Sequence, residues 1–170
     1  TKWRIHDLGR PQPRVVKPAM RSCSGPRAPR GGVTLFDGRS TAGFTGDKLG
    51  LWPVADGALP ATARETNRIA SRRAFGDMRL HLEYRAPAPP QGVWQFRGNS
   101  GVFLMGLYEV QLLDSYRNPT DPDGQMAALY GQRPPLVNAS LPPGRWQCID
   151  IDFRAPRFAR GRVIAPARVT

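Results

Sequence analysis

Hydrophobic and polar residues alternate most clearly in two stretches of the chain, residues 77–84 and 147–153. In both stretches an apolar side chain occupies every second position, and mostly polar or charged side chains stand between them. Successive side chains of a strand point to opposite faces, so each stretch predicts a β-strand with one buried face and one wet face. The inward-facing residues are Met78, Leu80, Leu82, Tyr84, Ile149, Ile151 and Phe153.

A longer apolar stretch, residues 101–113, predicts two further strands that meet near Gly106. In the second of these strands, Tyr108, Val110 and Leu112 are expected to face the core. The positions between them then share the opposite face. These positions hold Glu109, Gln111 and Leu113.

The remaining segments are short and are separated by turn signals. An apolar run at 33–36 ends at Asp37-Gly38, and residues 51–54 contain Pro53, which favours an edge strand or no strand at all. A brief strand is expected near Ile69. The 18 Gly and 18 Pro residues leave little room for long helices. We therefore predict an all-β fold, an antiparallel β-sandwich or jelly roll.

The charge of the chain is concentrated at its two ends. The formal net charge is +12; residues 1–32 carry eight Lys/Arg and one acid, and residues 153–170 carry five Arg and no acid. Residues 33–152 are balanced, with twelve basic and twelve acidic residues. We divide the chain into a basic, proline-rich arm (1–32) and a folded domain (33–170).

This distribution argues against several classes of protein. A nucleic-acid-binding domain would carry its basic residues in a stripe on the folded body, so we predict no nucleic-acid partner. No apolar run approaches the ~18 residues needed to cross a bilayer, so we predict no membrane insertion. Cys23 and Cys148 are expected to be a thiol of the arm and an ordinary strand residue, with a disulfide between them as the alternative. No metal-binding motif occurs.

Two segments carry the candidate chemistry. Glu109 and Gln111 point to the same side of one strand, and Asp114 follows them, so together they could grip a sugar hydroxyl or move a proton. The competing interpretation is that the two strand residues simply face solvent, and the pattern alone favours it. The loop 123–140 offers amides and a phenol that suit polyol recognition, although turn-rich loops also use such groups to cap their own backbone. A lone strand histidine such as His81 is more often a surface residue than a general base.

Several ordered blocks of the sequence resemble the 3-keto-disaccharide hydrolase domain family. The first block is Asn99-Ser100-Gly101-Val102-Phe103-Leu104-Met105-Gly106, continued by Tyr108-Glu109-Val110-Gln111 and Asp114-Ser115-Tyr116. Similar blocks lie at 35–38, 75–77 and 123–147, and the agreement runs from Leu35 to about Phe158. The arm, with Trp3, His6 and Asp7, is similar to that of the family as well.

The resemblance implies a concanavalin-like or laminin-G-like jelly roll that is secreted or periplasmic in bacteria and acts on sugars oxidised at C3. A ketone at C3 acidifies the hydrogen on C2, so a base can remove it while the C1 oxygen leaves, and water then adds back. Such a site needs a base, an acid and a group that polarises the carbonyl. The resemblance implies no definite cofactor, although a divalent metal could assist at the carbonyl.

On this basis we assign proton transfer to Glu109 and Asp114. The residues expected to hold sugar hydroxyls or to polarise the ketone are Asn99, Gln111, Tyr116, Gln125, Tyr130, Gln132 and Asn138.

The sequence also departs from the family pattern. Leu107 stands where relatives often carry Arg, and the chain ends where the family continues into further strands, so we expect a jelly roll that lacks its C-terminal strands. This leaves two alternatives to an enzyme. One is a non-catalytic carbohydrate-binding module or inactive fragment on the same fold. The other is a polyanion-binding protein whose binding depends on its basic ends and collapses with salt.

Overall fold

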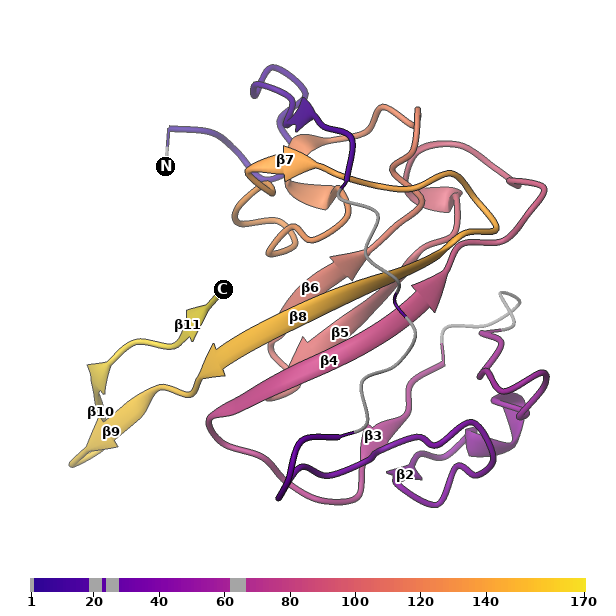
Figure 1. The fold of residues 1–170 in the computed structure, drawn as a ribbon. Coiled ribbons are helices and arrows are strands. Elements are labelled where there is room, and N and C mark those ends of the chain that lie inside the picture. The colour runs from indigo at the N-terminus through magenta and orange to yellow at the C-terminus, as the bar shows by residue number, and fades with distance from the viewer. Residues whose placement is uncertain (1, 19–22, 24–27, 62–66) are drawn as a thin grey trace. The chain divides into compact units, whose positions relative to one another are not determined.

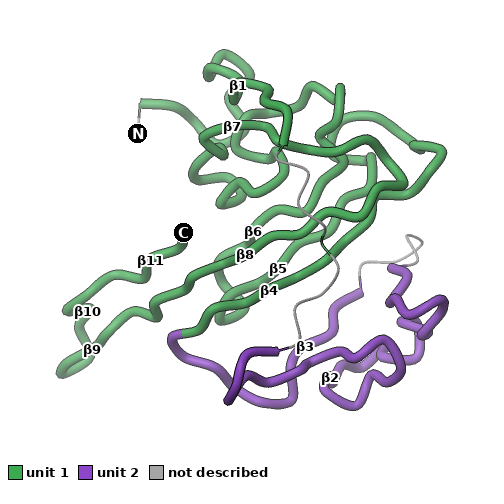
Figure 2. The backbone as a smooth tube through the Cα atoms, viewed as in Figure 1, with its two compact units in different colours: residues 1–25, 78–170 green, residues 26–77 purple. Residues whose placement is uncertain are grey.

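The computed structural model describes residues 2–18, 23, 28–61 and 67–170, and it contains two compact units. Unit 1 comprises Thr1–Gly25 and Met78–Thr170, and unit 2 comprises Pro26–Asp77 (Figure 2). Strands are the main regular structure of unit 1, unit 2 has only two short strands, and the helices of the described residues are single 3₁₀ turns. None of these turns has the length and apolar character that a membrane-spanning helix requires.

Unit 1 contains nine strands and two 3₁₀ turns among its described residues. They are β1 (Arg14–Val15), β4 (Met78–Arg85), η2 (Trp94–Phe96), β5 (Ser100–Leu104), β6 (Tyr108–Leu112), η3 (Pro122–Gly124), β7 (Val137–Asn138), β8 (Trp146–Arg154), β9 (Arg157–Ala159), β10 (Arg162–Ala165) and β11 (Arg168–Val169).

The strand pairs β4–β8 and β5–β6 form the body of unit 1 (Figure 1). β8 lies between β4 and β11, and β4 pairs with it over eight residues, from Met78 opposite Phe153 to Arg85 opposite Trp146. β5 and β6 form a hairpin whose turn contains Gly106, a residue with a φ of 68° that a side chain would strain. Each of these pairings is antiparallel.

The hydrophobic core lies between these two layers. Its buried members are Leu104 from β5, Val110 from β6, and Ile151 and Phe153 from β8. The inward residues Met78 and Leu80 of β4 pack against them. The strands predicted at 77–84, 101–113 and 147–153, the turn near Gly106 and the all-β antiparallel class are therefore confirmed, whereas the apolar run at 33–36 forms no strand. A short parallel pairing of β1 with β7 is the exception.

The arm predicted at residues 1–32 is divided between the units, with its described residues 2–18 and 23 in unit 1 and 28–32 in unit 2. Arg14 and Val15 form β1, and Val16 donates its backbone N–H to the Asn138 carbonyl at 2.9 Å. Cys23 forms a disulfide with Cys148 of β8, which is the alternative that the sequence left open. The boundary at residue 33 stays a prediction.

Unit 2 contains the antiparallel pair β2 (Phe44–Thr45) and β3 (Ala70–Ser71), with η1 at Leu49–Leu51. β3 confirms the brief strand expected near Ile69. Residues 52–54 form no strand, as Pro53 allowed, and the turn at Asp56-Gly57 closes a bridge between Ala55 and Ala58.

Candidate functional site

The outward face of β6 is covered by protein. Gln111 is only 1% exposed and Glu109 is half-buried. The interpretation that both residues face solvent, which the pattern favoured, is therefore wrong for Gln111.

The Gln111 side chain on this face donates to Gln95 Oε1 and to the Gly124 carbonyl. The segment after β6, which contains Gly124, also folds back and pairs with the edge of that strand. Gln111 donates its N–H to the Ala128 carbonyl at 3.0 Å and accepts a bond from the Ala127 N–H at 2.9 Å. Tyr130 donates its N–H to the Glu109 carbonyl at 2.9 Å. This pairing places the predicted residues Glu109 and Tyr130 side by side.

Two buried carboxylates and a histidine of the N-terminal segment meet beside Tyr130. His6 Nδ1 lies 2.6 Å from Asp121 Oδ2, and the His6 backbone N–H donates to Asp123 Oδ2 at 3.2 Å. The His6 and Tyr130 ring centroids are 5.0 Å apart. Because Gly131 donates its N–H to the Asp123 carbonyl, Asp123 is tied to the segment that carries Tyr130.

His6 holds a left-handed backbone conformation, with a φ of 59°. Few residues other than glycine adopt this conformation, although histidine does so more often than most, and it persists where surrounding contacts fix it. Here the backbone and ring of His6 are both held by carboxylates, while its side chain remains 41% exposed. The imidazole is thus held in one orientation while part of it remains accessible to solvent.

A network of amides connects these carboxylates to β6. Gln95 Nε2 donates to Asp121 Oδ1 at 3.1 Å and to Thr120 Oγ1 at 2.9 Å. Gln111 Nε2 donates to Gln95 Oε1 at 2.9 Å, and Asn99 Nδ2 donates to the Gln95 carbonyl at 2.8 Å. The network fixes the orientation of the Gln95, Gln111 and Asp121 side chains.

Hydrogen bonding and burial shift two ionisation equilibria in this cluster. Burial acts to raise the pKa of Asp121, but the hydrogen bonds from Thr120, His6 and Gln95 outweigh it and leave that pKa below its usual value. Burial, followed by the neighbouring charges of Asp121, Glu109 and Asp123, raises the pKa of the Tyr130 phenol. The site therefore combines an ionised carboxylate with a phenol that keeps its proton.

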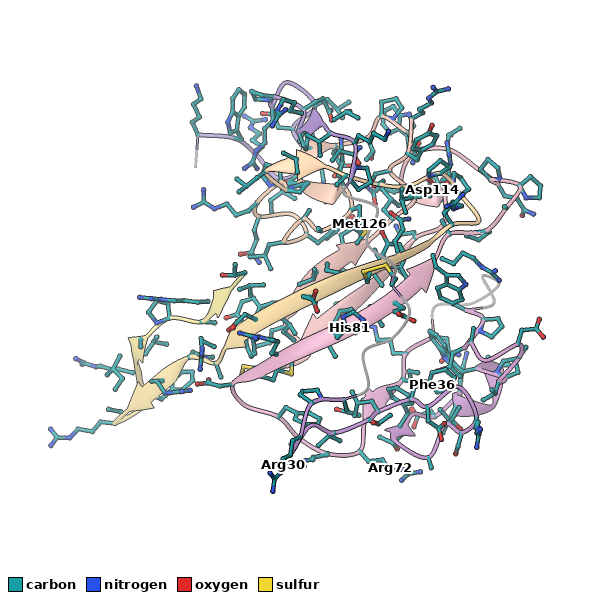
Figure 3. The ribbon with its side chains drawn as sticks, in the orientation of Figure 1. Arg30, Phe36, Arg72, His81, Asp114 and Met126 are labelled. Carbon is teal, nitrogen blue, oxygen red and sulfur yellow. A yellow bond between two sulfur atoms is a disulfide. The ribbon has the colours of Figure 1, made fainter. Side chains whose placement is uncertain are left out.

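Asp114, the second residue assigned to proton transfer, is held by other partners. Its side chain is 1% exposed, and its Oδ2 accepts a bond from Arg97 Nε at 2.7 Å. Arg97 Nη2 also donates to the Tyr116 carbonyl, and the Tyr116 N–H donates to Asp114 Oδ1. Figure 3 shows Asp114 among the loops beyond the sheet, well away from His81 on β4. These contacts describe an anchor for the turn after β6.

The other predicted residues lie in three different environments. Gln132 is exposed on the Tyr130 segment. Tyr116 and Asn138 line a cavity of about 490 Å³, together with residues 15–18 and Leu141. Gln125 is buried and donates to the Gln12 side chain. The structure therefore brings Glu109, Gln111, Tyr130 and Asn99 together and places Tyr116, Asn138 and Gln125 elsewhere.

Sequence reasoning named His6 only as part of the family-like arm, and it did not assign Asp121, Asp123 or Gln95 to the site. None of them lies in a periodic stretch, and His6 is separated from its partners by more than 110 residues. The sequence Asp121-Pro122-Asp123-Gly124 was the available signal, since two carboxylates flank a rigid proline next to a turn.

The chain was compared with known proteins. The model of a family described as 3-keto-alpha-glucoside-1,2-lyase-like domains matches residues 31–164. A crystal structure from Parabacteroides distasonis ATCC 8503, provisionally described as a glycosyl hydrolase, superposes with a TM-score of 0.75 at 38% sequence identity. The match covers 81% of this chain and 59% of that one, so the chain spans less than two thirds of its structural relative. No curated protein matches.

Proposed function

The chain belongs to the family of 3-keto-alpha-glucoside-1,2-lyase-like domains, and we propose that it cleaves glycosides whose sugar carries a ketone at C3. The family match confirms the resemblance found in the sequence, and the P. distasonis structure supports the jelly-roll sandwich and a glycosidase-type function. The substrate and mechanism given below are our proposal.

The reaction is an elimination followed by hydration. A base removes the proton from C2, the electrons of that C–H bond form the C1–C2 double bond, and the C1–O bond breaks. The leaving oxygen takes up a proton, which releases the free sugar or alcohol. Water then adds across the double bond, giving the net products of hydrolysis without an oxidant or reductant.

We assign removal of the C2 proton to Glu109 and protonation of the leaving oxygen to the Tyr130 phenol. These groups are adjacent because the Tyr130 segment pairs with β6, and adjacent acid and base groups are what such a reaction requires. Asn99 and Gln132 are exposed near them and would hold sugar hydroxyls. Gln111 is buried and hydrogen-bonded to Gln95, so it would act as a positioning residue.

We propose a positioning role for Asp114, because its side chain forms an ion pair. Because its carboxylate is engaged by Arg97 and the Tyr116 N–H, it would position the turn that follows β6.

One observation carries the proposal: three distant segments of the chain meet at a single half-exposed polar patch. The N-terminal segment supplies His6, β6 supplies Glu109 and the loop supplies Tyr130. Burying polar groups costs free energy unless each one forms a hydrogen bond. A protein that needed polar residues only for solubility would not have to bury them in one cluster, so this cluster favours a functional role.

The test is a Glu109→Gln variant incubated with a 3-keto-disaccharide, with release of the free sugar followed over time. We expect turnover to fall by about 100-fold or more, the usual contribution of a positioned acid or base, while substrate affinity is retained. Glu83→Gln is the matched control, because it changes a strand glutamate of β4 that lies outside the site. Equal turnover in both variants would remove Glu109 from the mechanism.

The same measurement addresses the carbohydrate-binding module. A pure binding module would bind the 3-keto-disaccharide and release no sugar even as the unaltered chain.

We further propose that the chain works in a secreted or periplasmic compartment of a bacterium. The disulfide between Cys23 and Cys148 supports this, because disulfides persist mainly in oxidising compartments. Trapping the thiols of freshly lysed cells with an alkylating agent tests it: a reduced pair in the native host would contradict the proposal.

A further inference from the structure

The His6 cluster has the arrangement of a metal-binding site. His6 Nδ1 lies 2.6 Å from Asp121 Oδ2 and 3.7 Å from Asp123 Oδ1. The three donor atoms all lie within 4.8 Å of one another. One ion at ordinary coordination distances of about 2.0–2.2 Å could therefore contact all three after small side-chain movements.

A second observation points to a ligand at this position. Asp123 is only 1% exposed, yet its Oδ1 atom accepts no hydrogen bond from any described residue. The other oxygen, Oδ2, accepts the His6 N–H and lies 3.8 Å from Arg10 Nη1. A buried carboxylate oxygen without a donor is costly. Because Oδ1 faces the imidazole nitrogen that Asp121 also faces, a bound cation would satisfy it.

The second histidine of the chain, His81, also lies near two carboxylates, but their arrangement does not suit a single metal ion. His81 Nδ1 lies 2.8 Å from Asp150 Oδ1, but the second carboxylate, Glu83, approaches the other ring nitrogen, Nε2, at 3.9 Å. The two nitrogens of an imidazole point in different directions, so one ion cannot be shared by all three groups. At His6, both carboxylates face the same nitrogen.

We propose that His6 Nδ1, Asp121 Oδ2 and Asp123 Oδ1 bind a divalent first-row transition metal ion such as Mn²⁺ or Zn²⁺. An imidazole nitrogen with two carboxylates suits these ions, whereas Mg²⁺ and Ca²⁺ prefer all-oxygen sites. Three protein ligands leave further coordination positions open, as in catalytic metal sites. His6 is partly exposed, so an ion bound here would be reachable from solvent.

The role of the ion rests on the proposed function. In a 3-keto-glycoside, the C3 carbonyl oxygen and a neighbouring hydroxyl oxygen can bind one metal ion together. Such binding withdraws electron density from the carbonyl and makes the C2 proton easier to remove. The N-terminal segment would then supply the group that activates the ketone, and Glu109 of β6 would accept the proton.

Metal binding can be measured without any sugar. The purified chain is treated with a chelator, dialysed and titrated with Mn²⁺ and, separately, Zn²⁺, using calorimetry and, for Mn²⁺, its electron paramagnetic resonance signal. We expect about one ion per chain and a higher Tm in its presence, because a ligand that binds only the folded state stabilises it. Mg²⁺ serves as the negative control ion.

Variants locate the site. Asp123→Asn and His6→Gln should each weaken binding by about 100-fold or more, since even residues that only support metal ligands contribute 10- to 100-fold. His6→Gln changes a partly exposed side chain, so it tests the site should Asp123→Asn fail to fold. Asp150→Asn is the matched control, because it alters the other histidine–aspartate pair and should leave the affinity unchanged.

The results distinguish this inference from the proposed function. Failure of both ions to bind the unaltered chain, or binding that neither His6→Gln nor Asp123→Asn weakens, would overturn the metal site and leave the Glu109 test standing. Binding of one ion with no sugar release would retain the metal site and remove its role in elimination.

Discussion

At the scale of single residues, Asp114 offers a test of structural against catalytic roles. Its carboxylate is buried in an ion pair with Arg97, and breaking such a pair leaves a buried charge without its partner. We expect Asp114→Asn to lower the free energy of unfolding by about 3–5 kcal/mol, measured by urea denaturation. Sugar release per folded molecule should fall much less than in Glu109→Gln.

The exposed pair of Asp152 with Arg79 provides the comparison. The Arg79 side chain is 80% exposed and lies 3.6 Å from Asp152, so water screens the pair. Asp152→Asn should cost no more than about 1 kcal/mol. A loss as large as that of Asp114→Asn would show that burial does not set the difference.

The sequence identified part of the candidate site and missed the rest for a physical reason. Strand alternation put Glu109 and Gln111 on one face, and the block around Tyr130 drew attention to that loop. His6, Asp121 and Asp123 lie in proline-containing segments where no periodicity reports the direction of a side chain. Only the fold brings them together.

At the scale of elements, the strands with clear alternation were predicted well. β4, β5, β6 and β8 appear where the pattern put them, because one face of each packs against the core. The cover of β6 was not predicted, since it depends on a loop whose backbone pairs with that strand through Ala127, Ala128 and Tyr130. A loop that behaves partly as a strand carries no alternation signal.

The same substitution in β8 and in β10 tests whether burial determines how much an isoleucine contributes to stability. Ile151 of β8 is 2% exposed and belongs to the core cluster, whereas Ile164 of β10 is 66% exposed. Ile151→Ala should lower the free energy of unfolding by about 2–5 kcal/mol, since it removes buried methyl groups and leaves a cavity. Ile164→Ala, the same change at an exposed position, should stay within about 0.5 kcal/mol. Urea denaturation of both variants measures the difference, and similar losses would contradict the assignment of the core.

At the scale of the whole molecule, the disulfide is the connection with the longest reach. Cys23 and Cys148 are separated by 125 residues along the chain, and their Cα atoms lie 5.6 Å apart, within the usual range for a disulfide. The bond fastens the N-terminal segment, which carries His6 and β1, to the central strand β8. The sequence had favoured two separate cysteines, because spacing alone does not reveal a pairing over such a distance.

A cross-link of this span should stabilise the protein mainly by restricting the unfolded chain. The chain-entropy relation gives about 5 kcal/mol for a closed loop of this length, and measured losses usually fall between about 2 and 5 kcal/mol. We expect a reducing agent to lower the free energy of unfolding by about 2–5 kcal/mol, which urea denaturation would show as a lower midpoint concentration. A double variant, Cys23→Ser with Cys148→Ser, should be as unstable as the reduced protein and indifferent to the reducing agent. If the unaltered chain unfolds at the same urea concentration in both redox states, the disulfide does not hold the N-terminal segment in solution. In that case the placement of His6 would depend on noncovalent contacts of the N-terminal segment, among them those with Asp121 and Asp123 and the β1–β7 pairing.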